Sequence, residues 1–195
     1  MPGERSESDG GGRRASDTMA KSVTPTSPSA SLRSAPPPQG GGGKATRDDF
    51  AFFHLLRVRW AEVDAQGIVF NPNYFLYFDV GMTEYTRAIG YSYPQQMRAM
   101  GTDLYAVNAN ANFMGSALYD DMLDIAVRVS RIGRSSFSFA MAVFRGDALL
   151  VEGSLTYVHA TIDTRNSTPL PEDYVSRILA FERTPPEQKA SAPAV

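Results

Sequence analysis

The sequence contains no cysteine, and only two of its 195 residues are histidines, His54 and His159. The absence of cysteine excludes disulfide bonds, thiolate nucleophiles and cysteine-based metal sites. The two histidines show no HExxH-like spacing and are too few for a histidine-rich metal site. The composition therefore predicts no metal centre.

The sequence also lacks a strong charge imbalance and a long apolar run. Its formal net charge of −2 gives no general attraction to nucleic acid or to anionic lipid. No apolar stretch approaches the roughly 20 residues needed to cross a bilayer. Hydrophobic residues nevertheless make up 43% of the chain, so we expect one domain with a sizeable core, no nucleic-acid partner and no membrane span.

Both ends of the chain are poor in aliphatic residues. Residues 1–48 are rich in Gly, Ser, Pro and Arg, and residues 184–195 read TPPEQKASAPAV. Such segments cannot bury enough apolar surface to offset the entropy lost on ordering. We therefore expect disordered ends around a folded domain at residues 49–183. The first segment has no apolar run of a secretory signal. The lack of acidic residues from Met19 to Arg47 leaves a transit peptide open, although the Pro and Gly content opposes its amphipathic helix, and Met19 is an alternative start.

One long helix is predicted to begin at Asn71 and Pro72. Proline suits the first helical position because its missing N–H would be unpaired there, and Asn71 is a favourable cap. The helix is expected to end near Ile89, before Gly90. Shorter helical segments are expected at residues 93–100 and 171–181.

Apolar residues recur at every second position through most of the region after residue 103, a pattern typical of half-buried strands. The stretches with this alternation are residues 105–113, 123–130, 136–143 and 149–157, and residues 52–60 are also predicted to be extended. The connections, such as Gly133-Arg134 and Gly146-Asp147, are too short for crossover helices. The prediction is an α+β domain with a five-stranded antiparallel sheet and one long helix.

Three segments resemble hot-dog-fold acyl-CoA thioesterases of the 4-hydroxybenzoyl-CoA thioesterase type. They are RWAEVDAQGIVFNPNYFLYFDVG, ANANFMGSALYDDMLDI and RIGRSSFSF, and the likeness extends over residues 52–163. It implies a sheet wrapped around the long helix and dimers that join two sheets edge to edge. Because a single sheet leaves an edge and an apolar face to cover, we expect a homodimer or homotetramer.

The resemblance places the catalytic carboxylate at Asp64. An ionised aspartate can attack a thioester carbonyl or activate water. The developing oxyanion needs donors, and the helix N-terminus at Asn71, Asn73 and Tyr74 would supply backbone N–H groups. The segment Gly67, Ile68 and Val69 would line the substrate.

Other interpretations of these carboxylates are open. Asp and Gly in DAQG also form an ordinary turn, in which Asp64 bonds its own following backbone. We expect Glu62 to lie in a solvated loop and Asp79 on the helix surface. Glu84, in the middle of the predicted helix, is a second catalytic candidate, but we expect it to be structural or exposed. Where relatives commonly have Tyr or His, this chain has Asn71, whose amide cannot transfer a proton at neutral pH.

Arg131 and Arg134 flank a predicted turn where the family tends to place cations for the CoA phosphates. Guanidinium groups suit phosphate through bidentate contacts, although a solvated turn explains them nearly as well. Asn112 and Ser116 are weaker candidates for the mouth of the site. We expect His159 in the core and His54 at the surface or an edge.

The function implied is hydrolysis of acyl-CoA to a carboxylic acid and free CoA, without a metal or a bound organic cofactor, in the cytoplasm. One alternative is a non-catalytic acyl-CoA-binding or scaffold domain, which would not need Asp64. The other is a dehydratase acting on acyl thioesters, which usually recruits a histidine with an acidic partner.

Overall fold

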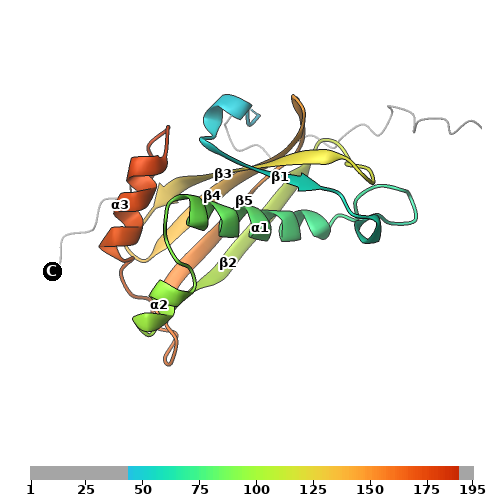
Figure 1. Cartoon of the computed structure of the whole chain (residues 1–195). Coiled ribbons are helices and arrows are strands. Elements are labelled where there is room, and N and C mark those ends of the chain that lie inside the picture. Colours follow the sequence, from blue (N-terminus) through green and yellow to red (C-terminus); the bar gives the residue numbers. More distant parts are fainter. Residues whose placement is uncertain (1–43, 189–195) are drawn as a thin grey trace, which may run out of the picture. The chain divides into compact units, whose positions relative to one another are not determined.

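The computed structural model describes residues 44–188 (Figure 1). The helices are η1 (Arg47–Asp49), η2 (Trp60–Glu62), α1 (Asn73–Ala88), α2 (Gln95–Ala99) and α3 (Glu172–Phe181). The strands are β1 (Phe52–Arg57), β2 (Thr102–Phe113), β3 (Met122–Ile132), β4 (Ser136–Arg145), β5 (Ala148–Thr161) and β6 (Glu187–Gln188). No helix within this described range is long and apolar enough to cross a membrane.

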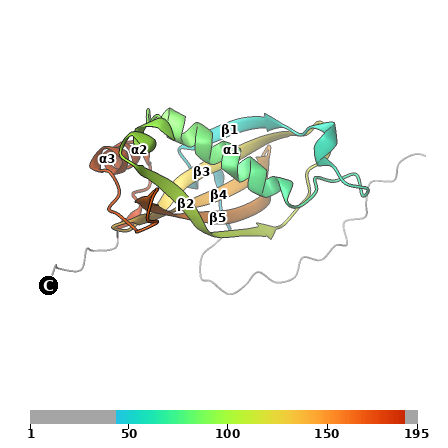
Figure 2. The ribbon, with the colours of Figure 1, turned by 90° about the horizontal axis from the view of Figure 1, so that it is seen from below.

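The five long strands form an antiparallel sheet in the order β1-β3-β4-β5-β2, and the short β6 adds in parallel to β3. Helix α1 lies lengthwise across one face of this curved sheet (Figures 1 and 2). The predicted α+β class and the five antiparallel strands are confirmed. Strand β6 is an addition that the sequence pattern did not indicate.

One face of α1 forms the centre of the core. Its buried residues recur three or four positions apart, the spacing that places side chains on one face of a helix. They are Tyr74, Tyr77, Phe78, Gly81, Met82, Tyr85 and Thr86. At Gly81 the helix comes so close to β3 that an added Cβ would lie 2.8 Å from Ile125 Cγ2.

The start of the described chain packs on the outer face of the sheet, away from α1. Phe50 is buried in a second apolar cluster with Phe144, and Arg47 forms an ion pair of 2.9 Å with Asp124. The Ala45 N–H donates a hydrogen bond of 3.0 Å to Glu152. Residues 44–48 were expected to be disordered, but these contacts fix them to the sheet; residues 1–43 lie outside the described part.

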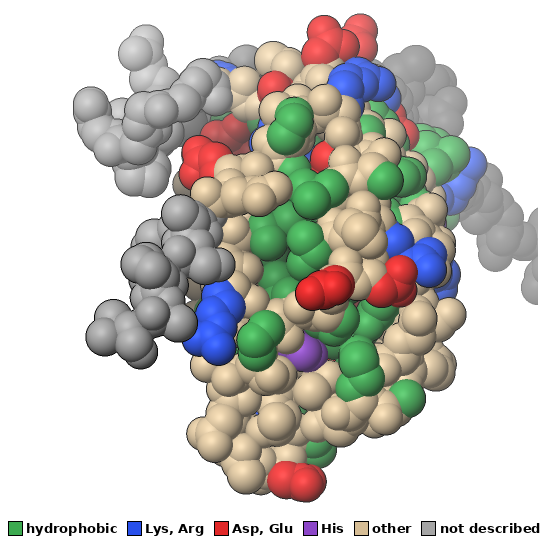
Figure 3. Space-filling view, turned by 90° about the vertical axis from the view of Figure 1, so that its left-hand side faces the viewer, with side chains coloured by type: hydrophobic (Ala, Val, Ile, Leu, Met, Phe, Trp, Pro, Cys, Tyr) green, Lys and Arg blue, Asp and Glu red, His purple; other side chains and the backbone are tan. Residues whose placement is uncertain are grey.

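Helix α3 and the residues after it cover the edge of β3 that β1 leaves open. Seen from this end, apolar side chains gather in the middle of the face (Figure 3). Glu182 accepts hydrogen bonds of 2.6 Å from the Tyr85 hydroxyl and from the Val129 N–H. Pro186 is buried and β6 follows it, so residues 184–188, expected to be disordered, belong to the domain; residues 189–195 lie outside the described part.

Burial of Glu182 is expected to make the stability of the protein depend on pH. Burial raises the pKa of its carboxyl group, and the hydrogen bonds from Tyr85 and Val129 oppose this effect only in part. The folded protein therefore binds this proton more tightly than the unfolded chain does, so its contribution to stability is present at acid pH and is lost as pH rises through the raised pKa. We expect Glu182→Gln to raise the melting temperature by a few degrees at pH 7.5 and to have little effect at pH 4. Thermal melts of both proteins at the two pH values check this; a larger gain at pH 4 than at pH 7.5 would contradict it.

Candidate active site

Residues 62–70 form a small hairpin directly before α1. The Glu62 carbonyl accepts the Phe70 N–H at 2.9 Å, and the Asp64 N–H donates to the Ile68 carbonyl at 2.9 Å. The Gly67 N–H closes the turn on the Asp64 carbonyl at 2.9 Å. Gly67 has a φ of +76°, which glycine adopts without the steric cost of a side chain. Asp64 therefore lies at the turn of a hairpin whose second strand leads into the helix.

The Asp64 carboxylate is half-buried and has one oxygen engaged. Its Oδ1 accepts the Gln66 N–H at 2.7 Å, which is the local turn bond that the sequence offered as an alternative to catalysis. Within residues 44–188, Oδ2 has no hydrogen-bond or ion-pair partner. The turn bond thus orients the carboxylate and leaves one oxygen available for chemistry.

The start of α1 differs from the prediction. The helix begins at Asn73, one residue later than expected, and the Asn71 side chain makes no capping hydrogen bond. A tight turn replaces the cap, because the N–H groups of Asn73 and Tyr74 donate to the carbonyls of Phe70 and Asn71 at 2.9 and 3.2 Å. Of the three predicted oxyanion donors, only the Asn71 N–H has no acceptor among the described residues.

The side chains of Asn73 and Tyr74 instead hold the helix to its neighbours. The Asn73 amide donates to the Glu62 carbonyl at 2.8 Å. The Tyr74 hydroxyl accepts the Ala117 N–H at 3.0 Å, and the Val69 N–H donates to the Ala117 carbonyl at 2.9 Å. The hairpin, the first turn of α1 and the loop 114–121 therefore form one connected frame around Asp64.

Glu62 is not in a solvated loop as predicted, since only 6% of its surface is exposed. Its Oε2 accepts hydrogen bonds from the Arg59 backbone N–H at 2.7 Å and from the Tyr77 hydroxyl at 2.9 Å. Its Oε1 accepts both the Nε, at 2.7 Å, and the Nη2 of Arg59. Burial alone would raise the pKa of Glu62, but the hydrogen bonds from Arg59 and Tyr77 outweigh it and lower the pKa below its ordinary value.

Large apolar side chains surround the hairpin and remain exposed in the single chain. Trp60, on the segment leading into it, packs edge-on against Tyr119 with ring centroids 5.2 Å apart. Phe70 and Leu118 are also exposed, by 51% and 41%. Ile68 is half-buried and Val69 is buried. Because isolated monomers seldom expose so many neighbouring apolar groups, this region suits an acyl group or a protein interface.

The predicted phosphate-binding arginines do not lie near Asp64 within one chain. The hairpin adjoins Leu118, just before β3 begins. Arg131 is near the other end of this strand, about 30 Å away at roughly 3.3 Å per residue. Arg134 is exposed beyond it. Arg145 is closer to the site: it bonds Asp121 at 2.7 Å and approaches the carbonyl of Ser116 in loop 114–121.

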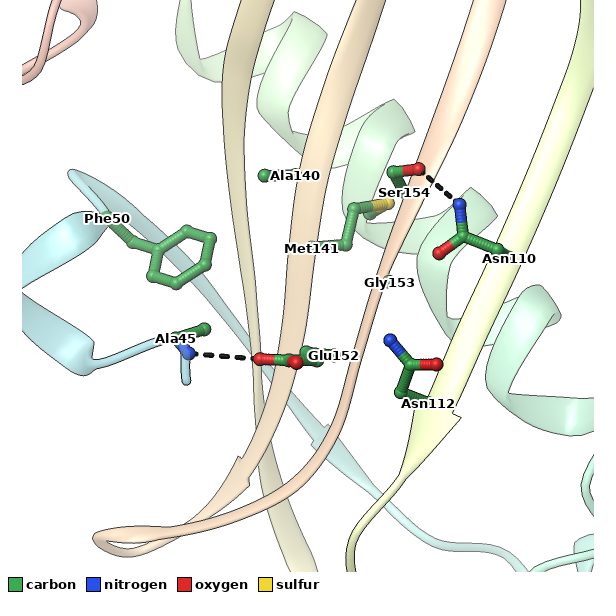
Figure 4. A pocket seen from close by; sticks show the side chains of 9 residues that line it. All are labelled: Ala45, Phe50, Asn110, Asn112, Ala140, Met141, Glu152, Gly153 and Ser154. Carbon is green, nitrogen blue, oxygen red and sulfur yellow. Dashed lines mark hydrogen bonds between the residues drawn. The ribbon is translucent and has the colours of Figure 1, made fainter. Parts of the chain in front are cut away.

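The remaining candidates occupy structural or peripheral positions. Asn112 lines a pocket on the outer face of the sheet, with Ala45, Phe50 and Glu152, and no lining residue of that pocket belongs to the hairpin, to α1 or to loop 114–121 (Figure 4). Buried His159 bonds the Pro169 carbonyl at 2.7 Å, as expected of a core histidine.

The other carboxylates of α1 are in the predicted environments. Asp79 is exposed, and Glu84 is half-buried in an ion pair with Arg87 on the same helix. Within residues 44–188, no cluster of three or more His, Asp or Glu side chains could hold a metal ion. Asp64 is thus the carboxylate that combines partial burial with an oxygen that has no partner in the described chain.

Comparisons with known proteins identify the family of this chain. Residues 66–160 match the model of the thioesterase superfamily. A putative esterase of Aquifex aeolicus is 33% identical over 103 residues, which are 53% of this chain and 80% of that protein. The chain belongs to the thioesterase superfamily. This membership supports thioester hydrolysis as the general activity.

More distant similarities support the same fold. An acyl-CoA thioesterase of Haemophilus influenzae is 22% identical over 107 residues, which are 55% of this chain and 79% of that protein. The crystal structure of a 1,4-dihydroxy-2-naphthoyl-CoA thioesterase from Synechocystis superposes with a TM-score of 0.61 at 19% identity, covering 65% of this chain and 94% of that one. The hot-dog fold predicted from the sequence is confirmed.

Proposed function

We propose that this thioesterase hydrolyses acyl-CoA, with Asp64 as nucleophile or general base and the Asn71 backbone N–H polarising the carbonyl. The observation that carries the proposal is the hairpin: Asp64 holds one free carboxylate oxygen, and the opposite strand ends one residue before an N–H without an acceptor in the described chain. A carboxylate and an oxyanion donor on one rigid frame are the two groups that thioester cleavage needs.

Two routes use these groups. In the first, Asp64 Oδ2 bonds to the carbonyl carbon, the C–S bond breaks to release CoA thiolate, and water hydrolyses the resulting anhydride. In the second, Asp64 removes a proton from water as the water oxygen bonds to the carbonyl carbon, and the same C–S bond breaks. In both routes the negative charge on the carbonyl oxygen is stabilised by the Asn71 N–H.

The exposed aromatic side chains next to the hairpin favour the 4-hydroxybenzoyl-CoA thioesterase type. Trp60, Phe70 and Tyr119 offer flat apolar surfaces that suit a planar acyl group. The Synechocystis relative in fold acts on the aromatic thioester in its name. We therefore propose an aromatic acyl-CoA as the substrate class, with Gly67, Ile68 and Val69 beside the thioester.

We also propose a homodimer joined along β2. In the described part of the chain this strand pairs with β5 on one side and has no strand on the other. Val107 on it is 59% exposed. In such an assembly Arg131 and Arg134, which lie far from Asp64 in their own chain, would serve CoA phosphates bound by another copy.

A substitution on β2 tests this assembly. We expect Val107→Glu to convert the dimer to monomers, because it places a carboxylate from each copy at the joined edge, where it loses water and repels its counterpart. Light scattering at micromolar concentration measures the mass. Leu55→Glu on the other edge strand, where Leu55 is 60% exposed, is the control and should remain dimeric. A monomeric wild-type protein would overturn the proposal.

The activity is tested with a panel of aliphatic and aromatic acyl-CoAs and a thiol reagent. Release of free thiol, fastest with an aromatic acyl group, is the expected result. Binding without thiol release would instead support an acyl-CoA-binding or scaffold domain. A dehydratase is disfavoured because neither His54 nor His159 lies in the hairpin or in α1.

A further inference from the structure

We propose that Glu62 is a positioning residue that fixes the Asp64 carboxylate relative to the Asn71 N–H; this rests on the proposed hydrolysis at Asp64. Glu62 makes no contact with the reacting groups, because Arg59 and Tyr77 occupy both of its carboxylate oxygens. Its role follows instead from what it connects.

The backbone of Glu62 joins the two strands of the hairpin at their base. Its carbonyl accepts the Phe70 N–H at 2.9 Å and the Asn73 amide at 2.8 Å. Asp64 lies two residues after Glu62, and Asn71 lies one residue after Phe70. The carboxylate and the oxyanion donor therefore extend from opposite partners of a single hydrogen-bonded pair. Movement of that pair changes the separation on which attack at the carbonyl depends.

The side chain of Glu62 anchors this pair to the helix. Tyr77 lies one turn into α1, and its buried hydroxyl donates to Glu62 Oε2 at 2.9 Å. Arg59 supplies three further donors from the approach to the hairpin. A buried carboxylate held by four hydrogen bonds has one strongly favoured position. The hydrogen bond from Tyr77 thus fixes the base of the hairpin relative to α1, and with it the position of Asp64.

The chain offers a matched control for this bond. Tyr85 lies two turns further along the same helix, is also buried, and donates its hydroxyl to the carboxylate of Glu182 at 2.6 Å. Tyr77→Phe and Tyr85→Phe therefore remove the same kind of bond from the same helix. Only Tyr77 faces the hairpin, so a loss of stability alone would affect both variants, whereas a loss of positioning affects only one.

We expect Tyr77→Phe to lower kcat on the best acyl-CoA about 10-fold with little change in KM, and Glu62→Gln to lower it further, since a small displacement of reacting groups is costly. Tyr85→Phe should keep the wild-type kcat. In the Asp64→Asn background, Tyr77→Phe should cause no additional loss, because its effect acts through Asp64.

Hydrogen exchange of the hairpin amides gives a readout that does not depend on activity. Tyr77→Phe should accelerate exchange in peptides that cover residues 63–70, and Tyr85→Phe should not. Equal exchange and equal kcat in the two variants would overturn the positioning role. Absence of hydrolysis by the wild-type protein would overturn the proposed function, while faster exchange in Tyr77→Phe would still establish that Glu62 holds the hairpin.

Discussion

Asp64→Asn should fold normally and lose at least ~100-fold in kcat on the best acyl-CoA, equivalent to about 2.7 kcal/mol of transition-state stabilisation. Asparagine retains the oxygen that accepts the Gln66 N–H at 2.7 Å, so the turn survives. The amide cannot attack the thioester or accept a proton from water at neutral pH. Steady-state kinetics and a thermal melt measure the two effects separately.

The control for this substitution is Asp79→Asn, which removes the same charge from an exposed position on α1. It should retain wild-type kcat. The wild-type protein and both variants should bind the acyl-CoA with similar affinity, because the apolar surfaces and the phosphate contacts are unchanged. If Asp64→Asn hydrolyses its substrate at the wild-type rate, Asp64 serves only the turn and Glu84 becomes the next carboxylate to test.

Gly153→Ala should lower the melting temperature by on the order of 10 °C, corresponding to about 3 kcal/mol of overpacking. Gly153 lies in β5 where the sheet curves against α1. An added Cβ would be 2.3 Å from the Asn110 carbonyl oxygen on β2 and 2.8 Å from Phe78 Cε2. Backbone on one side and a buried ring on the other leave no easy relaxation, so β5 must move away from β2 or from the helix.

Gly115→Ala is the matched control. Its added Cβ would meet the Leu150 Cδ2 methyl at 3.0 Å, and the next atom, Leu150 Cα, at 3.8 Å. A side-chain methyl can rotate away, so we expect only a small change in melting temperature. Thermal melts under identical conditions compare the two variants. Equal melting temperatures for Gly153→Ala and the wild-type protein would show that the sheet can flatten at this point without cost.

The sequence predicted the elements of the fold well because local patterns determine them. Alternation of apolar residues identified the four later strands, and Gly90, with a φ of +72°, ended the long helix as expected. Gly153 interrupts the apolar alternation of β5, and an isolated glycine in a strand can indicate a close approach of another backbone. The sequence does not show, however, that the atoms approaching it belong to Asn110 and Phe78. The packing of residues 44–48 and 184–188 likewise depends on distant surfaces, to which their composition gives no clue.

The candidate site was predicted less completely, because several of its contacts join residues that are far apart in the sequence. The turn at Asp64 and, to within one residue, the start of α1 follow from a contiguous motif, while the catalytic role of Asp64 stays a prediction. Glu62 was assigned to a solvated loop, since its partner Tyr77 is fifteen residues away and nothing local indicates burial. Asn71 matched a helix cap by residue type, but the turn bonds of Asn73 and Tyr74 removed the need for one. Arg131 and Arg134 were joined to the site by family resemblance alone, and their places near the far end of β3 and just beyond it separate them from the site in one chain.

The most direct test of the central claim is product analysis of an aromatic acyl-CoA incubated with the full chain in ¹⁸O-labelled water. Hydrolysis predicts free CoA and carboxylic acid in equal amounts, with an oxygen from water in the acid and many turnovers per enzyme. Mass spectrometry detects both products in one sample. Stable binding of acyl-CoAs across the panel with no CoA released above the enzyme-free rate would contradict the assignment of this hairpin as a hydrolytic site.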